Sequence, residues 1–318
     1  MSQQPASSSD ASSRNQLIAW LILAFLALVW GSSFILIKKS LEHGFSPTEL
    51  GASRLIMAGL FLFPFFWRYL KRLTRTEMIA IAMVGLVGTG IPATLFPLAQ
   101  TVISSTTSGM LNSLAPLFTL VLGALFFGFT FDKAKLIGVI IGMAGAFILI
   151  FARSSDGGIG GDADFTDQIL YALIAVVATL GYGISTNIMK RYLNNTHPVV
   201  VTALAIYFVT IPYAIYLFGF TDMPAKIFSG DPEILEGLFY VTLLGALGTG
   251  LALLLFNRLV QLTDAVVSSS VTYLIPIVAL VWGVWDNEAI GWAHIVGMLV
   301  ILAGVWLVNS KKKKPLKD

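Results

Sequence analysis

The feature that most constrains this chain is a series of apolar stretches, each long enough to cross a lipid bilayer. A membrane-spanning helix needs about 20 predominantly apolar residues, and only short connections separate these stretches. With 56% hydrophobic and 12% charged residues, the chain cannot hide so much apolar surface in one soluble core. We therefore predict an all-α integral membrane protein with ten transmembrane helices. The predicted spans are 17–37, 48–67, 77–98, 103–126, 134–152, 167–189, 199–219, 235–256, 265–285 and 290–309.

One stretch occurs twice, and the two copies lie 160 residues apart. Ser104–Gly123 aligns with Asp264–Gly283, and each copy has a proline inside its apolar part, Pro116 or Pro276. Proline removes a helical hydrogen bond and clashes with the preceding turn, so neighbouring protein or an internal cavity must accept the exposed backbone. Paired interruptions of this kind indicate the binding site of a transporter. We therefore predict hinges at both prolines.

The similarity extends over most of two halves of the chain. Residues 85–126 match 245–286 at twelve of 42 positions, and Trp30–Lys39 aligns with Tyr182–Arg191. Each half holds five predicted spans, an odd number, so the second copy enters the membrane from the opposite side. The prediction is a pair of inverted five-helix repeats around a central cavity. The predicted repeats are residues 17–152 and 167–309.

The segments outside the repeats are short and polar. Residues 1–16 are Ser-rich and are predicted to form a disordered cytoplasmic tail, not a cleaved signal peptide. The Gly- and Asp-rich linker 153–166 is predicted to be external, and 310–318 to be a basic cytoplasmic tail. With the amino terminus inside, fifteen of the 20 Lys and Arg residues are cytoplasmic, four are external and Arg54 lies within a span. This topology places both termini in the cytoplasm, with the spans in the plasma or inner membrane.

Composition also limits the classes of function. The positive net charge is explained by topology, and no folded basic domain remains that could bind nucleic acid. The sequence has no cysteine, so it has neither disulfides nor thiol metal ligands, and its three histidines are scattered. We therefore expect no catalytic residue, no metal and no cofactor. A membrane-embedded enzyme, which would need converging histidines, carboxylates or metal ligands, stays an alternative, as does a structural or sensory membrane protein.

Several short motifs resemble those of a known family. The WGSSF motif at Trp30–Phe34, a lysine at the end of the first span, Arg54 in the second, prolines in spans four and nine and Gly-rich spans five and ten resemble the EamA-type branch of the drug/metabolite transporter superfamily. The resemblance covers about residues 17–309. It implies a helical bundle with a central cavity that moves small polar metabolites, such as amino acids or their derivatives, often outward.

Polar side chains form stripes on the predicted helices. In span four, Ser105, Ser108, Asn112, Pro116 and Thr119 are spaced three or four residues apart, which places them on one helix face. Because polar groups are costly in lipid, this face is predicted to point into the bundle. The predicted substrate-binding residues, from this stripe and its counterparts in other spans, are Trp30, Ser33, Gln100, Ser108, Asn112, Tyr182, Asn187, Asn257, Ser269, Thr272 and Tyr273.

A lining of hydroxyls, amides and aromatic faces suits a zwitterionic or neutral metabolite with an apolar part. The alternative for each Ser and Thr is a purely structural role, since these residues often pack between membrane helices or bond their own backbone. Taken together, the sequence predicts a transporter that moves small polar or amphipathic metabolites across the membrane by alternating access, as an exporter. Its partners are then a small-molecule substrate and the lipid bilayer.

The deepest ionisable residues are Arg54, Glu49 and His294, and two roles are open for Arg54. The first is structural pairing, although Glu49 is five positions away and does not stack ideally on the same helix face. The second is to hold a carbonyl group or a substrate carboxylate.

Glycines recur along the fifth and tenth spans at spacings that let two helices approach closely. The contact is predicted to lie either between these two spans or between two copies of the chain in a homodimer. The glycines concerned are Gly138, Gly142, Gly145, Gly297 and Gly304.

Overall fold

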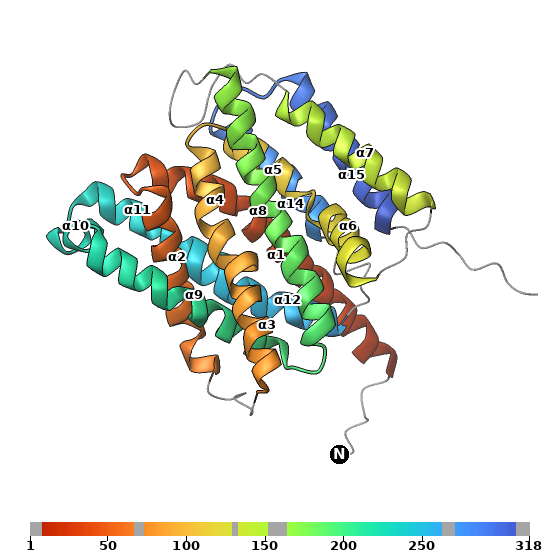
Figure 1. Ribbon diagram of the computed structural model, residues 1–318, viewed down its shortest axis with the longest axis horizontal. Coiled ribbons are helices and arrows are strands. Elements are labelled where there is room, and N and C mark those ends of the chain that lie inside the picture. The colour runs from red at the N-terminus through yellow and green to blue at the C-terminus, as the bar shows by residue number, and fades with distance from the viewer. Residues whose placement is uncertain (1–7, 67–72, 129–132, 152–163, 263–270, 310–318) are drawn as a thin grey trace, which may run out of the picture.

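The computed structural model describes residues 8–66, 73–128, 133–151, 164–262 and 271–309, and within these ranges every regular element is a helix (Figure 1). The helices of the first half are α1 (Ser8–Glu42), α2 (Pro47–Phe66), α3 (Arg75–Gly85), η2 (Leu86–Gly90), α4 (Ile91–Gln100), α5 (Ser105–Asn112), α6 (Ala115–Phe127) and α7 (Lys133–Ile150). Those of the second half are α8 (Phe165–Tyr192), α9 (Pro198–Phe220), α10 (Met223–Ser229), α11 (Pro232–Thr242), η3 (Leu243–Leu251), α12 (Ala252–Leu262), α14 (Val271–Trp285) and α15 (Trp292–Asn309).

In the part of the chain that the structure describes, eight helical runs are long and apolar enough to cross a membrane. Each coincides with a predicted span. The other two predicted spans lie on α2, a 20-residue helix with two charged side chains, and on α14, which has 15 residues. The all-α, multi-pass class is therefore confirmed, while the number of ten crossings stays a prediction.

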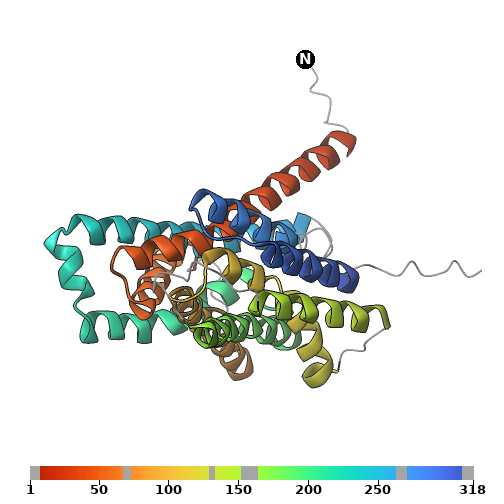
Figure 2. The same cartoon turned by 90° about the horizontal axis from the view of Figure 1, so that it is seen from above.

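The outer surface of the bundle is apolar, as lipid contact requires. Large hydrophobic side chains are exposed on many helices, including Phe126 on α6, Ile215 on α9 and Trp306 on α15. A soluble protein rarely exposes so much contiguous apolar surface. At its amino end α1 extends out of the bundle (Figure 2), and it begins at Ser8, inside the segment predicted as a disordered tail.

Equivalent helices of the two halves make equivalent contacts. α14 packs against α1, and α6 packs against α8. The helix η3 packs on α2, as η2 does on α9. α7 and α15 lie side by side at one edge of the bundle, while α10 lies at the opposite edge (Figures 1 and 2). Each half therefore buries its helices against those of the other half.

The glycines of α7 and α15 form the contact between the fifth and tenth predicted spans. A Cβ atom added to Gly304 would lie 2.5 Å from the carbonyl oxygen of Gly138, and one added to Gly145 would lie 2.8 Å from that of Gly297. Only residues without side chains let two backbones approach so closely. The predicted contact between the fifth and tenth spans is thus present in the structure.

Both halves also contain a π-helical turn at the same place, in the sequences LVGTG (η2) and LLGALGTGL (η3). The Thr249 hydroxyl donates to the Leu244 carbonyl oxygen, five residues earlier, at 3.3 Å. Such π-turns are rare and are frequently found at functional sites. A Cβ atom on Gly85, at the start of η2, would meet the Ala205 carbonyl oxygen, and one on Gly245 would meet that of Arg54 at 2.6 Å. Ala205 and Arg54 therefore occupy equivalent positions in the two halves.

The two prolines differ in their local structure. In the first half α5 ends at Asn112 and α6 begins at Ala115, so Pro116 stands in the first turn of a new helix, where its missing N–H is not needed. In the second half α14 runs through Pro276 without interruption. Hinge motion at these prolines stays a prediction.

Candidate functional site

The two aromatic residues predicted for the site, Trp30 and Tyr182, lie at equivalent points of α1 and α8. The Trp30 indole N–H donates to the Gly248 carbonyl oxygen at 3.0 Å, and its ring centre lies 5.4 Å from that of Phe256. The Tyr182 ring stacks on Phe96 with 6.0 Å between centres. Each aromatic residue therefore packs against a phenylalanine of the other half, so both ring pairs lie at the contact between the halves.

Arg54 on α2 faces the same region. Its Nε donates to the Thr249 hydroxyl of η3 at 3.1 Å. Glu49 is not its partner, since the Glu49 carboxylate accepts from the backbone N–H of Ser46 at 2.9 Å and closes the first turn of α2. Ser33 was also predicted for the site, but its hydroxyl donates to the Val29 carbonyl oxygen, one turn earlier on α1, at 3.0 Å. Such a bond to the local backbone is what a purely structural role for this serine predicts.

Several predicted amide and hydroxyl groups are buried without a hydrogen-bond partner among the described residues. Both polar atoms of the Gln100 side chain, the Ser108 hydroxyl, and Oδ1 of Asn112 and of Asn187 are of this kind. Nδ2 of Asn187, in contrast, donates to the carbonyl oxygens of Thr119 and Gly183, each at 2.9 Å. An unpaired buried polar atom costs about 1–3 kcal/mol, so these groups have unused capacity to bind water or a polar ligand.

The predicted residues of the second half are placed differently. The Tyr273 hydroxyl donates to the Val305 carbonyl oxygen at 3.1 Å and accepts from Nδ2 of Asn309 at 2.9 Å, so it bonds to α15. Thr272 is partly buried on α14. Asn257 lies on α12, but its side chain is outside the described residues, and so is all of Ser269.

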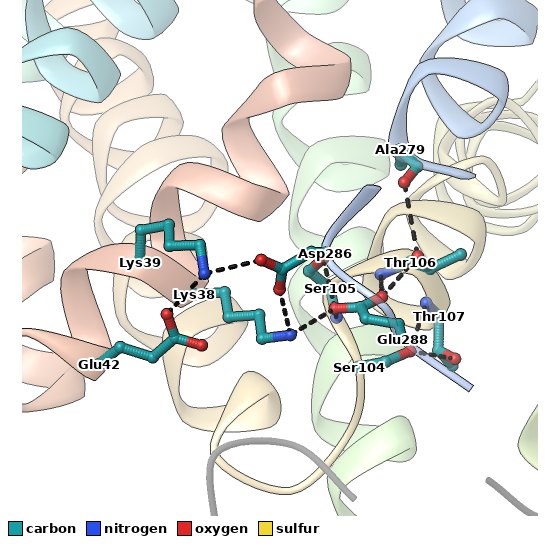
Figure 3. Close-up of polar contacts among 10 residues, drawn as sticks. All are labelled: Lys38, Lys39, Glu42, Ser104, Ser105, Thr106, Thr107, Ala279, Asp286 and Glu288. Carbon is teal, nitrogen blue, oxygen red and sulfur yellow. Dashed lines mark hydrogen bonds and ion pairs between the residues drawn. The ribbon is translucent and has the colours of Figure 1, made fainter. Parts of the chain in front are cut away.

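A group of charged and hydroxyl side chains, which we call the end cluster, joins α1, the start of α5 and the loop between α14 and α15 (Figure 3). The Glu288 carboxylate accepts four hydrogen bonds from α5: two from the backbone N–H groups of Ser105 and Thr106, each at 3.0 Å, and two from their hydroxyls, at 2.8 and 2.6 Å. A helix amino terminus presents free N–H groups and a partial positive charge, which both favour a carboxylate. The end cluster consists of Lys38, Lys39, Ser105, Thr106, Asp286 and Glu288.

Two lysines from the end of α1 complete the end cluster. Lys38 Nζ pairs with Asp286 and lies 3.2 Å from Oε1 of Glu288, while Lys39 Nζ lies 2.7 Å from Asp286 and 2.8 Å from Glu42. The Glu288 side chain is only 4% exposed. Nearby, the Trp282 indole N–H of α14 donates to the Ser32 hydroxyl of α1 at 2.7 Å. These contacts close one end of the bundle.

The end cluster keeps both acids ionised. Burial alone would raise the pKa of Glu288, but the hydrogen bonds from Thr106 and Ser105 and the charge of Lys38 outweigh it and hold that pKa below its ordinary value of 4.5. Burial likewise opposes ionisation of Asp286, and bonds from Lys38 and Lys39 hold its pKa below 3.8.

The end cluster has no counterpart among the aligned residues of the other half. Lys190 and Arg191, which align with Lys38 and Lys39, are exposed, and Phe126 stands where the second half has Asp286. α8 begins near the end cluster, because Gln168 and Ala172 line a small cleft with Ser104 and Thr107. Since α1 ends there, α1 and α8 run in opposite directions, and Lys190 lies at the far end of α8.

The end cluster was not predicted from the sequence. Lys38 and Lys39 are two of the four basic residues predicted to be external, and no partners were predicted for them. A signal was present, because Asp286 and Glu288 follow span nine, which ends on the same predicted side as span one. The separation of about 250 residues between the partners concealed the pairing.

The described helices thus form an all-helical membrane bundle of two equivalent halves with aromatic and polar groups between them, an arrangement typical of multi-spanning membrane transporters. The chain belongs to the EamA-like transporter family, whose sequence profile matches residues 18–151 and 169–310. The family match agrees with the resemblance seen in the sequence, and its two segments correspond to the two halves.

Curated relatives carry transporter names. An "Uncharacterized transporter" of Archaeoglobus fulgidus is 25% identical over 92% of this chain and 99% of its own length. The "Probable terminal-alkyne amino-acid exporter" of Streptantibioticus cattleyicolor is 25% identical over 91% of this chain and 92% of its own. A solved structure described only as "Crystal structure of protein" shares the fold with a TM-score of 0.59 at 18% identity, covering 91% of this chain and 95% of the other. Family and relatives thus identify a membrane transporter that acts on a small molecule.

Proposed function

We propose that this protein exports small polar or amphipathic metabolites, amino acids or related compounds, across the cell membrane by alternating access between two inverted five-helix repeats. The observation that carries the proposal is that equivalent helices of the two halves make equivalent contacts with the other half, while the end cluster joins α1, α5 and the loop between α14 and α15 at one end of the bundle. Two halves of this kind can exchange conformations and so open a central site to one face at a time.

In this conformation the end cluster holds α1, α5 and the loop between α14 and α15 together. At the opposite end Lys190 and Arg191 are exposed. With both termini cytoplasmic, the end cluster is external, and it closes the outer side in the state described. Export then requires substrate to enter from the cytoplasm and the end cluster to separate. The name of the Streptantibioticus relative supports an amino-acid substrate and the outward direction.

Six of the predicted site and hinge residues fit this scheme. Gln100, Ser108 and Asn112 contribute buried polar atoms that have no partner among the residues described, as a site for polar solute requires. Trp30 and Tyr182 contribute aromatic faces for an apolar part. Pro116 follows the break between α5 and α6, the place where the first repeat can bend.

Transport tests this proposal directly. We expect Asn112→Leu to reduce export of the transported amino acid from proteoliposomes by about tenfold, because one hydrogen bond to a buried polar group is lost. The protein is first screened for counterflow with a panel of amino acids and derivatives. The matched control is Asn194→Leu, the same change at an exposed loop position, which should leave transport unchanged. Equal export by Asn112→Leu and the native chain, at equal amounts of folded protein, would place the site elsewhere.

A further inference from the structure

Arg54 is a cation inside the bundle to which the described residues offer no carboxylate partner. The ion pairs seen among the described residues include those of Lys38, Lys39 and His43, and none of them involves Arg54. The equivalent position of the other half is Ala205, so the repeat architecture does not require a charge here. A charged side chain buried in a membrane protein without a partner is costly and calls for a functional explanation.

The hydrogen bonds of Arg54 leave its most useful donors free. Arginine has five N–H donors, and the planar fork of its two terminal nitrogens matches both oxygens of a carboxylate. Thr249 accepts from Nε at 3.1 Å, and within the described part of the chain no bond reaches the terminal nitrogens. Thr249 thus fixes the guanidinium plane while four donors stay available.

The surroundings of Arg54 provide space and apolar walls. Arg54 and Tyr182 are both enclosed by protein and interact electrostatically, yet each keeps part of its surface accessible to water. A water-sized molecule can therefore reach part of each side chain. Trp30 bonds to Gly248, the residue before Thr249, and Tyr182 stacks on Phe96. Aromatic rings of both halves thus lie close to the free donors.

We propose that Arg54 binds the carboxylate of the transported solute, with the apolar part of that solute lying against the rings of Tyr182 and Trp30. The inference rests on the proposed transport function and narrows its substrate to small carboxylates with an apolar or aromatic side group. The charge of Arg54 selects these against neutral compounds of the same shape. Thr249, which orients the guanidinium, is a positioning residue.

Binding of two isosteric probes tests the assignment. The full chain in lipid nanodiscs is titrated with 3-phenylpropionate and with its neutral amide, 3-phenylpropanamide, by calorimetry. We expect the native protein to bind the carboxylate about tenfold more tightly than the amide, because a charged hydrogen-bonded pair is lost with the amide. Arg54→Gln should remove this preference, and Arg54→Lys should keep part of it. Arg191→Gln, at an exposed arginine, is the control.

The outcomes separate this inference from the function it rests on. Equal affinity of the native protein for both probes, absence of binding of either probe, or an undiminished preference in Arg54→Gln would overturn the carboxylate site. Gel filtration and thermal unfolding verify that each variant is folded. Flux of the same probes in proteoliposomes is measured in parallel: Arg54-dependent binding without flux would support the site and contradict transport. Flux with no preference for the carboxylate would support transport and contradict the site.

Discussion

Replacing Glu288 by glutamine is expected to lower the free energy of unfolding by about 3 kcal/mol near neutral pH, because removing one partner of a buried ion pair leaves the others uncompensated. The Glu288 side chain is 4% exposed, and its carboxylate accepts from Ser105 and Thr106 and pairs with Lys38. Glutamine keeps the size of the side chain but removes its charge. Its amide nitrogen is a donor and would face groups that also donate, where the carboxylate oxygen accepted. Denaturant titration of the purified protein in mixed micelles measures the difference.

The effect of Glu288→Gln should depend on pH in a defined direction. The pKa of Glu288 in the folded protein lies below its ordinary value of 4.5. Above about pH 4.5 the carboxyl group is ionised in both the folded and the unfolded chain, so its full contribution to stability is present. As the pH falls below that value, the unfolded chain binds the proton first and the contribution is lost. The native protein and the variant should therefore converge in stability under acid conditions.

Glu236→Gln is the control for this prediction, since the Glu236 carboxylate is 55% exposed and lies 3.5 Å from His43. An exposed pair of this kind contributes about 0–1 kcal/mol. If Glu288→Gln and Glu236→Gln had equally small effects at neutral pH, the end cluster would not hold the helices together.

Adding one methyl group to Gly304 is expected to destabilise the protein by about 3 kcal/mol, which is the upper end of the usual cost of overpacking. The Cβ atom of Gly304→Ala would lie 2.5 Å from the carbonyl oxygen of Gly138 and 2.5 Å from the backbone nitrogen of Gly142. These atoms belong to the backbone of α7 and cannot move aside as a flexible side chain can. α7 and α15 would have to separate along their contact.

Gly219→Ala makes the same chemical change on α9, where no atom lies within 4 Å of the new Cβ. Alanine is favoured over glycine within a helix by about 0.5–1 kcal/mol, so this control should be neutral or slightly stabilising. Thermal unfolding in detergent compares the two variants with the native chain. A Gly304→Ala protein as stable as Gly219→Ala would contradict the close contact of α7 and α15.

Much of the fold could be predicted because hydrophobic burial in lipid depends on long apolar stretches, which a sequence displays directly. The sequence also shows the duplicated glycines, but it does not predict that they form the π-turns η2 and η3. Those turns depend on how Gly85 meets Ala205 and Gly245 meets Arg54 in the folded bundle. Hinges were predicted at both prolines alike. The structure has a break between α5 and α6 ahead of Pro116 and an unbroken α14 through Pro276, a difference that depends on packing that the sequence does not reveal.

The sequence predicts those features of the candidate site that depend on spacing along a single helix. Spacing along one helix put Ser108 and Asn112 on one face, and the structure leaves polar atoms of both unpaired among the described residues. Contacts between distant helices could not be predicted in this way. The bond of Tyr273 to α15 and the pairing of Lys38 with Glu288 each join separate elements, and only the folded chain brings their partners together.

Because the chain has no cysteine, a single introduced cysteine can report on the central claim without background. The measurement is labelling of Asn112→Cys by a membrane-impermeant maleimide, applied to either face of reconstituted protein of known orientation. We predict labelling from the face that carries Lys190 and Arg191, and additional labelling from the Lys38 face when Glu288→Gln is also present. Two results would contradict a chamber that opens alternately between the two repeats. One is that neither Asn112→Cys nor the double variant with Glu288→Gln is labelled from either face, and the other is that Asn112→Cys alone is labelled only from the Lys38 face.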